Sequence, residues 1–98
     1  MFEVYAIRSF LSGRVYIGQT RDVAMRLQRH NSGFVKSTSR ECPWQLIAME
    51  RVRSRDEARW IERKLKGSLG KRNTWLRDNG LTAYGSESEI SEQAVKQR

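Results

Sequence analysis

Glu62 stands out because of the residues that surround it on a helix expected at 55–66. At about 100° per residue, Ala58, Ile61 and Leu65 form one apolar stripe, and Glu62 falls on its edge. The stripe beside it is basic and consists of Arg55, Arg59, Arg63 and Lys66. An unpaired carboxylate at the edge of a core is costly, so Glu62 needs a partner. Two partners fit: a nearby arginine in a salt bridge, or a metal ion at the rim of a phosphate-binding surface.

His30 is the only histidine of the chain. On a helix expected at 22–31 it shares the inward stripe with two apolar residues, and Arg26 lies on the margin one turn away. A lone histidine on such a stripe is either a structural residue with satisfied hydrogen bonds or a participant in chemistry beside Arg26. Cys42 is the only thiol, so His30 cannot complete a Cys/His zinc cluster.

Tyr5 and Tyr16 are expected to lie on the same face of a β-hairpin. They share a face in any antiparallel register in which the numbers of each cross-strand pair add up to an odd value. A two-residue turn at 12–13 pairs Leu11 with Arg14 and so gives such a register. Gly18 falls on that face too, where its missing side chain would let a ligand backbone approach. The alternative is that both tyrosines are ordinary strand residues with their hydroxyls in water.

These residues are positioned by elements in the order ββαβαα. Strands are expected at 2–10, 14–18 and 44–52 and helices at 22–31, 55–66 and 69–79, with a loop at 34–43. Asp22 is the expected N-cap of the first helix, and Ser54 with Glu57 forms a capping box for the second. The fold class is therefore α+β, a small three-stranded antiparallel sheet flanked by helices. We expect one domain at 1–85 and a polar tail at 86–98 that frays.

The composition narrows the class of protein. Its 98 residues suffice for one domain, and one cysteine excludes a disulfide-stapled secreted protein and favours the cytoplasm, or the nucleoid if the cell is bacterial. Neither a signal peptide nor an apolar run of about 20 residues is present, so we expect no membrane association. The net charge is +8, and 14 of the 19 cations are arginine, whose planar fork suits phosphate oxygens. The expected large partner is a polyanion, most commonly nucleic acid.

The order of these residues resembles the GIY-YIG endonuclease family over about residues 3–67. The segment VYIGQTRDVAMRLQRHNSG is similar to the family's second motif half and first helix, and DEARWIERKLKG is similar to the helix that carries its metal-binding glutamate. The chain departs from the pattern at Glu3-Val4-Tyr5, where the name-giving motif has Gly-Ile-Tyr, and it offers only Asn73 for the late asparagine of some members. The chain is similar to small stand-alone members and to the catalytic domains of excinuclease C (its amino-terminal part) and of structure-selective junction endonucleases.

The resemblance implies hydrolysis of a phosphodiester with one divalent metal ion, Mg²⁺ or Mn²⁺, and no small-molecule cofactor. Glu62 would bind the metal ion, and Arg26 would hold the phosphate. Tyr5 is the favoured general base for the attacking water, with Tyr16 beside it and His30 as a proton relay if it reaches Tyr16 or the water. The charge of Arg26, the metal ion and the basic surroundings are expected to favour the phenolate form of a group whose usual pKa is about 10. The implied catalytic set is Tyr5, Tyr16, Gly18, Arg26, His30 and Glu62.

Other basic residues are expected to bind DNA. They are Lys36, Arg40, Arg55, Arg59, Arg63, Lys66, Lys71 and Arg72. Neutralising about five phosphates would give a log–log salt slope of about −4 to −5. Trp44, Trp60 and Trp75 are interpreted as core or domain-edge packing rather than as stacking platforms.

A chain this small has little surface for reading base sequence. We therefore expect the DNA to be branched, nicked or single-stranded, or a protein partner to supply targeting. Two alternatives stay open: a nucleic-acid-binding module on the same scaffold with a decayed site, and a protein-interaction domain whose basic face meets an acidic protein. A decayed copy would be expected to lack Tyr5, Tyr16, Arg26 or Glu62, and all four are present.

Overall fold

The computed structural model describes residues 1–81 and confirms the α+β class and the element order. The elements are β1 (Phe2–Ser9), β2 (Val15–Thr20), α1 (Val23–Ser32), a short 3₁₀ turn η1 (Ser39–Glu41), β3 (Trp44–Val52), α2 (Arg55–Gly67) and α3 (Leu69–Asn79). The expected domain boundary at residue 85 and the tail at 86–98 lie outside the described residues. Within residues 1–81, no helix has the length and apolar character that crossing a membrane requires.

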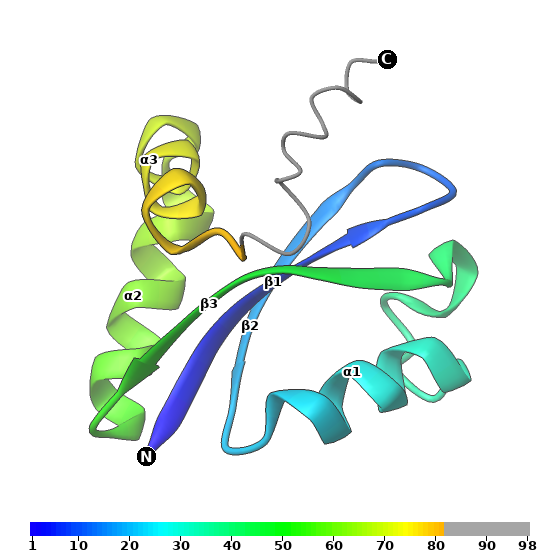
Figure 1. Ribbon diagram of the computed structural model, residues 1–98, viewed down its shortest axis with the longest axis horizontal. Coiled ribbons are helices and arrows are strands. Elements are labelled where there is room, and N and C mark those ends of the chain that lie inside the picture. Colours follow the sequence, from blue (N-terminus) through cyan, green and yellow to red (C-terminus); the bar gives the residue numbers. More distant parts are fainter. Residues whose placement is uncertain (82–98) are drawn as a thin grey trace.

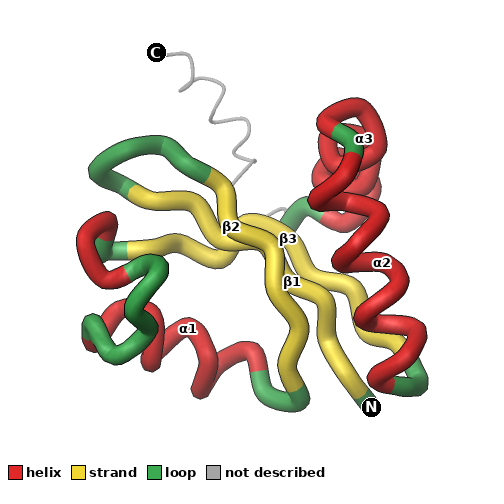
Figure 2. Tube along the Cα trace, turned by 180° about the vertical axis from the view of Figure 1, so that it is seen from behind, coloured by secondary structure: helices red, strands yellow, loops and turns green. Residues whose placement is uncertain are grey.

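The sheet has the order β2-β1-β3, and both pairings of the central strand β1 are antiparallel. Helix α1 covers one face of the sheet, and α2 and α3 lie together on the other (Figures 1 and 2). Strand β1 is buried on both faces because its side chains alternate between the two cores. Val4 and Ala6 pack in the core under α2 and α3, whereas Tyr5 and Ile7 pack with α1.

The helix ends follow the expected signals. The Asp22 side chain accepts a hydrogen bond from the backbone N–H of Met25, and the Ser54 hydroxyl accepts one from the N–H of Glu57. Gly33 ends α1 with φ of 84°, a left-handed conformation in which a glycine has no steric penalty. These caps explain why α1 and α2 begin where the sequence predicts.

The hairpin turn is longer than expected. Ser9 N–H donates to the carbonyl of Arg14 at 2.9 Å, so four residues, 10–13, form the turn instead of two. The Ser9 hydroxyl causes the difference, because it accepts hydrogen bonds from the N–H groups of Leu11 and Ser12, both at 3.0 Å. Tyr5 therefore pairs with Gly18, a shift of two residues from the expected register. A shift of two preserves the face of every side chain.

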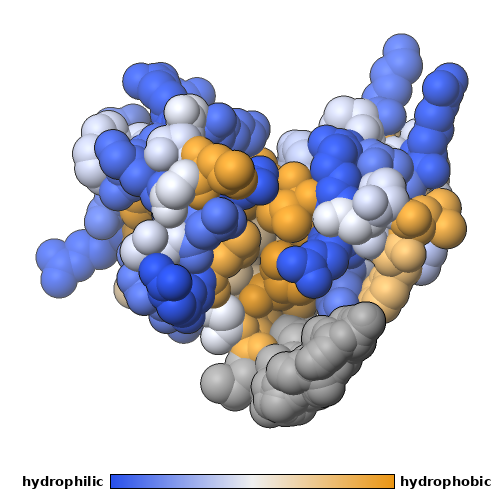
Figure 3. All heavy atoms as spheres, turned by 90° about the horizontal axis from the view of Figure 1, so that it is seen from above, coloured by the Kyte–Doolittle hydropathy of each residue, from blue (hydrophilic) through white to orange (hydrophobic). Residues whose placement is uncertain are grey.

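The interpretation of the tryptophans as packing residues is confirmed at two positions, and the third tryptophan lies outside the core. Trp44 and Trp75 are buried, whereas Trp60 is 60% exposed. Trp60 lies about 200° around α2 from Glu62, on the solvent side of the helix. Figure 3 shows hydrophilic side chains on both flanks of the molecule and apolar surface in the hollow between them.

Candidate active site

Tyr5 and His30 form a buried hydrogen-bonded pair beneath α1. The Tyr5 hydroxyl oxygen lies 2.9 Å from His30 Nε2, and the two side chains are 2% and 0% exposed. Strand β1 supplies the tyrosine, and the last turn of α1 supplies the histidine. His30 therefore hydrogen-bonds to Tyr5, and it also reaches the ring of Tyr16, although only through an edge-on ring contact.

Thr38 contacts the second ring nitrogen of His30. The Thr38 hydroxyl oxygen lies 2.8 Å from His30 Nδ1, and the hydroxyl also donates to the Val35 carbonyl at 3.3 Å. These contacts fit the tautomer in which Nδ1–H donates to Thr38 and Nε2 accepts the Tyr5 hydroxyl proton. Thr38 is fully buried, and its carbonyl accepts a hydrogen bond from Trp44 Nε1 at 2.9 Å. Sequence reasoning missed Thr38, because nothing in the polar loop at 34–43 distinguishes its one threonine from the serines on either side.

The protein environment shifts the pKa values of this pair. Burial raises the pKa of Tyr5 above its usual value, the neighbouring Tyr16 adds to the effect, and Arg26 opposes it. The expectation that the surroundings favour the phenolate is therefore wrong for the protein alone, because burial outweighs Arg26. Burial also lowers the pKa of His30, and the charges of Arg26 and Arg29 lower it further. His30 is consequently neutral near pH 7.

Tyr16 connects the buried pair to the surface. Its ring lies edge-on to His30 at 5.2 Å between centroids and 6.4 Å from the ring of Tyr5. On its other side, the Lys66 ammonium lies 5.6 Å from the centre of the Tyr16 ring. Tyr16 is half-buried, unlike Tyr5, and so belongs to the border between the core and solvent.

Gly18 is required because Tyr5 lies directly over it. A Cβ built on Gly18 would lie 2.6 Å from the Tyr5 hydroxyl oxygen and 2.7 Å from Cζ, well inside van der Waals contact. The expected free space at the floor of the site is therefore wrong, since the phenol of Tyr5 fills it. Gly18 serves the site by letting the tyrosine approach the neighbouring strand.

Glu62 faces solvent from the opposite side of Tyr16. Its carboxylate makes an ion pair with Lys66 at 2.7 Å, and its side chain is 22% exposed. The predicted salt bridge is thus present, with a lysine one helical turn away in place of an arginine. A hollow of about 500 Å³, hereafter the catalytic hollow, surrounds the pair and is lined by Arg59, Glu62, Arg63, Lys66 and Gly67. Exposed ion pairs contribute about 0–1 kcal/mol, so Lys66 can leave Glu62 at little cost.

The donor groups fit a hard cation that is bound together with substrate. Within residues 1–81 no cluster of three or more His, Cys, Asp or Glu side chains could hold a metal ion alone. Mg²⁺ needs only one or two carboxylates, since waters and phosphate oxygens complete its shell. Glu62 meets that need, and the cations around it suit the phosphate that would arrive with the ion.

The expected DNA-binding residues fall into separate groups. Three of them, Arg59, Arg63 and Lys66, line the catalytic hollow. Arg55 lies instead over the ring of Phe2 at 5.3 Å. The remaining four are distributed over the segment after α1 and over α3, namely Lys36, Arg40, Lys71 and Arg72. The structure therefore gathers three of the eight beside Glu62.

Arg26 lies at the border of the buried Tyr5–His30 pair. It is half-buried on α1, and its charge acts on the pKa values of both Tyr5 and His30. An always-charged guanidinium at the border of a buried proton pair is suited to hold a phosphate against that pair.

Comparison with known protein families identifies the family of the chain. The family model described as the GIY-YIG catalytic domain matches residues 1–75, a range that includes the Tyr5–His30–Thr38 chain and Glu62. No curated protein matches the chain. With more than three quarters of its length matched by that catalytic domain, the chain belongs to the GIY-YIG family and is a nuclease.

Proposed function

We propose that the protein is a divalent-metal-dependent endonuclease that hydrolyses phosphodiester bonds in DNA, with Glu62 holding one Mg²⁺ or Mn²⁺ ion. One observation carries the proposal: Tyr16 contacts the buried Tyr5–His30 pair on one side and the Lys66–Glu62 pair on the other. A phosphate placed beside Tyr16 would meet proton-transfer groups and a metal-binding carboxylate together.

In this proposal, Glu62, Arg26 and the metal ion handle the negative charge of the reacting phosphate. When bound, the ion would stabilise the negative charge that develops on the scissile phosphate and on the leaving oxygen. Glu62 would hold the metal ion in place of its ion pair with Lys66, and Lys66 would then be free to bind a flanking phosphate. Arg26 holds a non-bridging oxygen of the scissile phosphate, which fixes its orientation toward Tyr5.

Tyr5 removes the proton of the attacking water, and it does not need to be a phenolate beforehand. As Tyr5 takes the proton of the attacking water, it passes its own proton to His30 Nε2, and His30 becomes an imidazolium. The Tyr5–His30 distance of 2.9 Å supports this transfer, and a pKa of His30 below its usual value keeps the acceptor unprotonated at pH 7. The raised pKa of Tyr5 is then no obstacle, because the phenolate never accumulates.

The preferred substrate in this proposal is branched, nicked or single-stranded DNA. The cations beside Glu62 bind phosphates, which all DNA shares, so they position the backbone and read no sequence. Selectivity then comes from the shape of the DNA, or from a protein partner that delivers the nuclease.

The decisive test compares the full chain with its Glu62→Gln variant on a panel of linear, nicked, flapped and branched DNAs. We expect cleavage with Mg²⁺ or Mn²⁺, none with EDTA, and a loss of at least about 100-fold in Glu62→Gln with DNA binding retained. Asp56→Asn, an exposed carboxylate in the first turn of the same helix, is the matched control and should cleave normally. Cleavage that survives Glu62→Gln would refute the metal assignment, and equal cleavage of all forms would refute the shape preference.

A further inference from the structure

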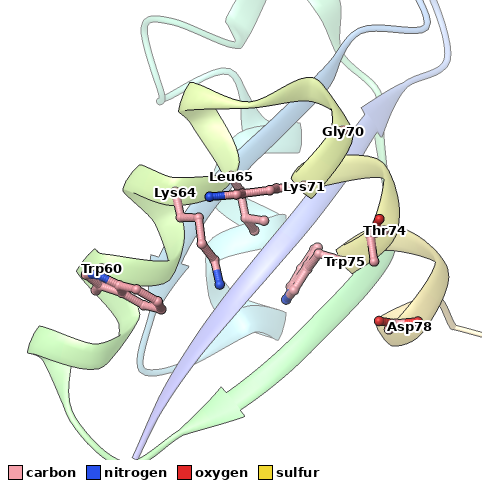
Figure 4. Close-up of a pocket in the computed structure, with 8 residues that line it drawn as sticks. All are labelled: Trp60, Lys64, Leu65, Gly70, Lys71, Thr74, Trp75 and Asp78. Atoms are coloured by element: carbon pink, nitrogen blue, oxygen red, sulfur yellow. The ribbon is translucent and has the colours of Figure 1, made fainter.

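A second concavity lies between α2 and α3, on the side of α2 away from Glu62. It has a volume of about 600 Å³, and its lining includes Trp60, Trp75, Thr74, two cations (Lys64 and Lys71) and one carboxylate (Asp78). Figure 4 shows Trp60 and Lys64 reaching from α2, and Trp75 from α3, toward this space. Hereafter it is the α2–α3 groove.

Trp60 is the largest exposed side chain in the groove. It is 60% exposed, and the Lys64 ammonium lies 4.4 Å from the centre of its ring. Trp75, by contrast, is 8% exposed and donates its indole N–H to Glu50 at 2.7 Å, so it forms a fixed wall. An exposed indole with a lysine ammonium over its ring can stack on a nucleic-acid base when the lysine moves from the ring to the neighbouring phosphate.

A continuous band of positive charge joins the groove to the catalytic hollow. Around α2, measured from Glu62 in the direction of Lys66, Lys66 and Arg59 lie at about 40–60° and Arg63 at about 100°. Trp60 follows at about 160° in this direction, which is the same position as about 200° in the other direction. Besides Glu62, no acidic side chain occurs between positions 59 and 66. Half the circumference of a helix about 10 Å wide is about 16 Å, the length of roughly five nucleotides at about 3.4 Å each.

We propose that the α2–α3 groove binds an unpaired DNA strand that leaves the catalytic hollow and follows this band around α2. Trp60 stacks on a base, and Lys64 and Lys71 bind the neighbouring phosphates. Duplex DNA resists bending below a persistence length of about 50 nm, so it cannot follow half the circumference of one helix, whereas a single strand can. The groove therefore selects substrates with a flap or a single-stranded arm. This inference rests on the proposed nuclease function and gives it a substrate class.

Binding of the full chain to fluorescein-labelled oligonucleotides, followed by anisotropy in EDTA, tests the groove separately from cleavage. For oligo-dT of about 20 nucleotides we expect Trp60→Ala to weaken binding about tenfold and Trp60→Phe to retain affinity within about threefold. A duplex of the same length should lose less than about twofold in both. In the Lys64→Gln/Lys71→Gln double variant, the log–log salt slope for oligo-dT should fall by about 1.4.

The control is Phe10→Ala, which removes another exposed aromatic, 65% exposed, from the hairpin turn. Its affinity for oligo-dT should stay at the wild-type value. The Trp60→Ala variant should have an unfolding temperature within about 2 °C of wild type, because the Trp60 side chain is mostly in solvent.

Unchanged binding of oligo-dT by Trp60→Ala would overturn the proposal, as would an equal loss of affinity for the duplex. Sedimentation that shows a dimer broken by Trp60→Ala would assign the groove to a second copy instead. A protein that binds as expected and cleaves nothing would refute the nuclease mechanism and leave the groove standing.

Discussion

On one side of Tyr16, Tyr5, His30 and Thr38 form a chain of hydrogen bonds in which no side chain is more than 2% exposed. On the other side, Glu62 makes one ion pair with Lys66 at the surface, and their side chains are 22% and 50% exposed. The first arrangement tolerates little change, because a buried polar group that loses its partner costs about 1–3 kcal/mol. The second rearranges freely, since a surface ion pair is worth about 1 kcal/mol at most.

The difference follows from what each side must do. Proton transfer requires fixed distances and one tautomer, which a packed core supplies. A metal ion and a phosphate, by contrast, must enter from water, so the groups that receive them have to be exposed and able to move. The two sides should therefore respond differently to mutation. Substitutions on the buried side should reduce both stability and activity, whereas substitutions on the exposed side should change only the dependence of activity on the metal ion and on DNA.

Gly18→Ala should have the largest combined effect on stability and cleavage among the variants of the buried side, because its new Cβ would meet the buried phenol of Tyr5. The new Cβ would lie 2.6 Å from the Tyr5 hydroxyl, so the phenol must move away from His30. We expect a loss of about 1–3 kcal/mol in the free energy of unfolding and a loss of cleavage of at least about tenfold. Urea unfolding and cleavage assays on the same preparation measure both.

A double-mutant cycle isolates the cause of the Gly18→Ala defect. Tyr5→Phe removes the atom nearest to the new Cβ, so the stability loss of the double variant should be smaller than the sum of the two single losses. Additive losses would place the defect elsewhere than on the phenol. Gly18 has no positive φ, so a change in backbone strain does not complicate the result.

Thr38→Val tests whether the buried chain sets the tautomer of His30. Valine keeps the shape of threonine but leaves His30 Nδ1–H without its acceptor, at a cost of about 1–3 kcal/mol. We expect a loss of cleavage of about 10- to 100-fold, with most activity restored by Thr38→Ser. The ¹⁵N chemical shifts of His30, the only histidine, report the tautomer directly. A wild-type ¹⁵N pattern in Thr38→Val would show that Thr38 is structural only.

The sequence predicts those parts of the molecule that depend on local signals. The bounds of β3 and α3 are confirmed at both ends, because alternation, caps and glycines act within a few residues. The hairpin register is wrong by two residues because one hydroxyl, that of Ser9, lengthens the turn. Thr38 and the role of Gly18 depend on side chains that meet only after folding. The exposure of Trp60 could have been predicted, since the helical wheel that places Glu62 at the edge of the apolar stripe places Trp60 about 200° away from Glu62.

The stability of the buried side should depend on pH through His30. Its pKa is below the usual value of about 6.5 in the folded protein, so below pH 6.5 the unfolded chain binds a proton that the folded chain does not. The free energy of unfolding should therefore fall as pH decreases from about 7.5 to 5.5, by at most about 1.4 kcal/mol per pH unit. Thermal unfolding across this range measures the slope, and a His30→Asn variant should flatten it.

Lys66→Met should have the smallest effect on stability and a clear effect on metal dependence. The substitution removes the ion pair that occupies Glu62, and an exposed pair contributes about 0.5 kcal/mol or less, so the free energy of unfolding should hardly change. The concentration of Mg²⁺ that gives half-maximal cleavage should fall a few-fold, because the ion no longer displaces an ammonium. The log–log salt slope of DNA binding should at the same time become about 0.9 less steep, since one phosphate contact is gone.

Arg77→Met removes an exposed charge from α3 and serves as the control for net charge alone. If both variants shift the Mg²⁺ dependence equally, the shift comes from net charge alone, and the pairing of Lys66 with Glu62 has no part in metal binding.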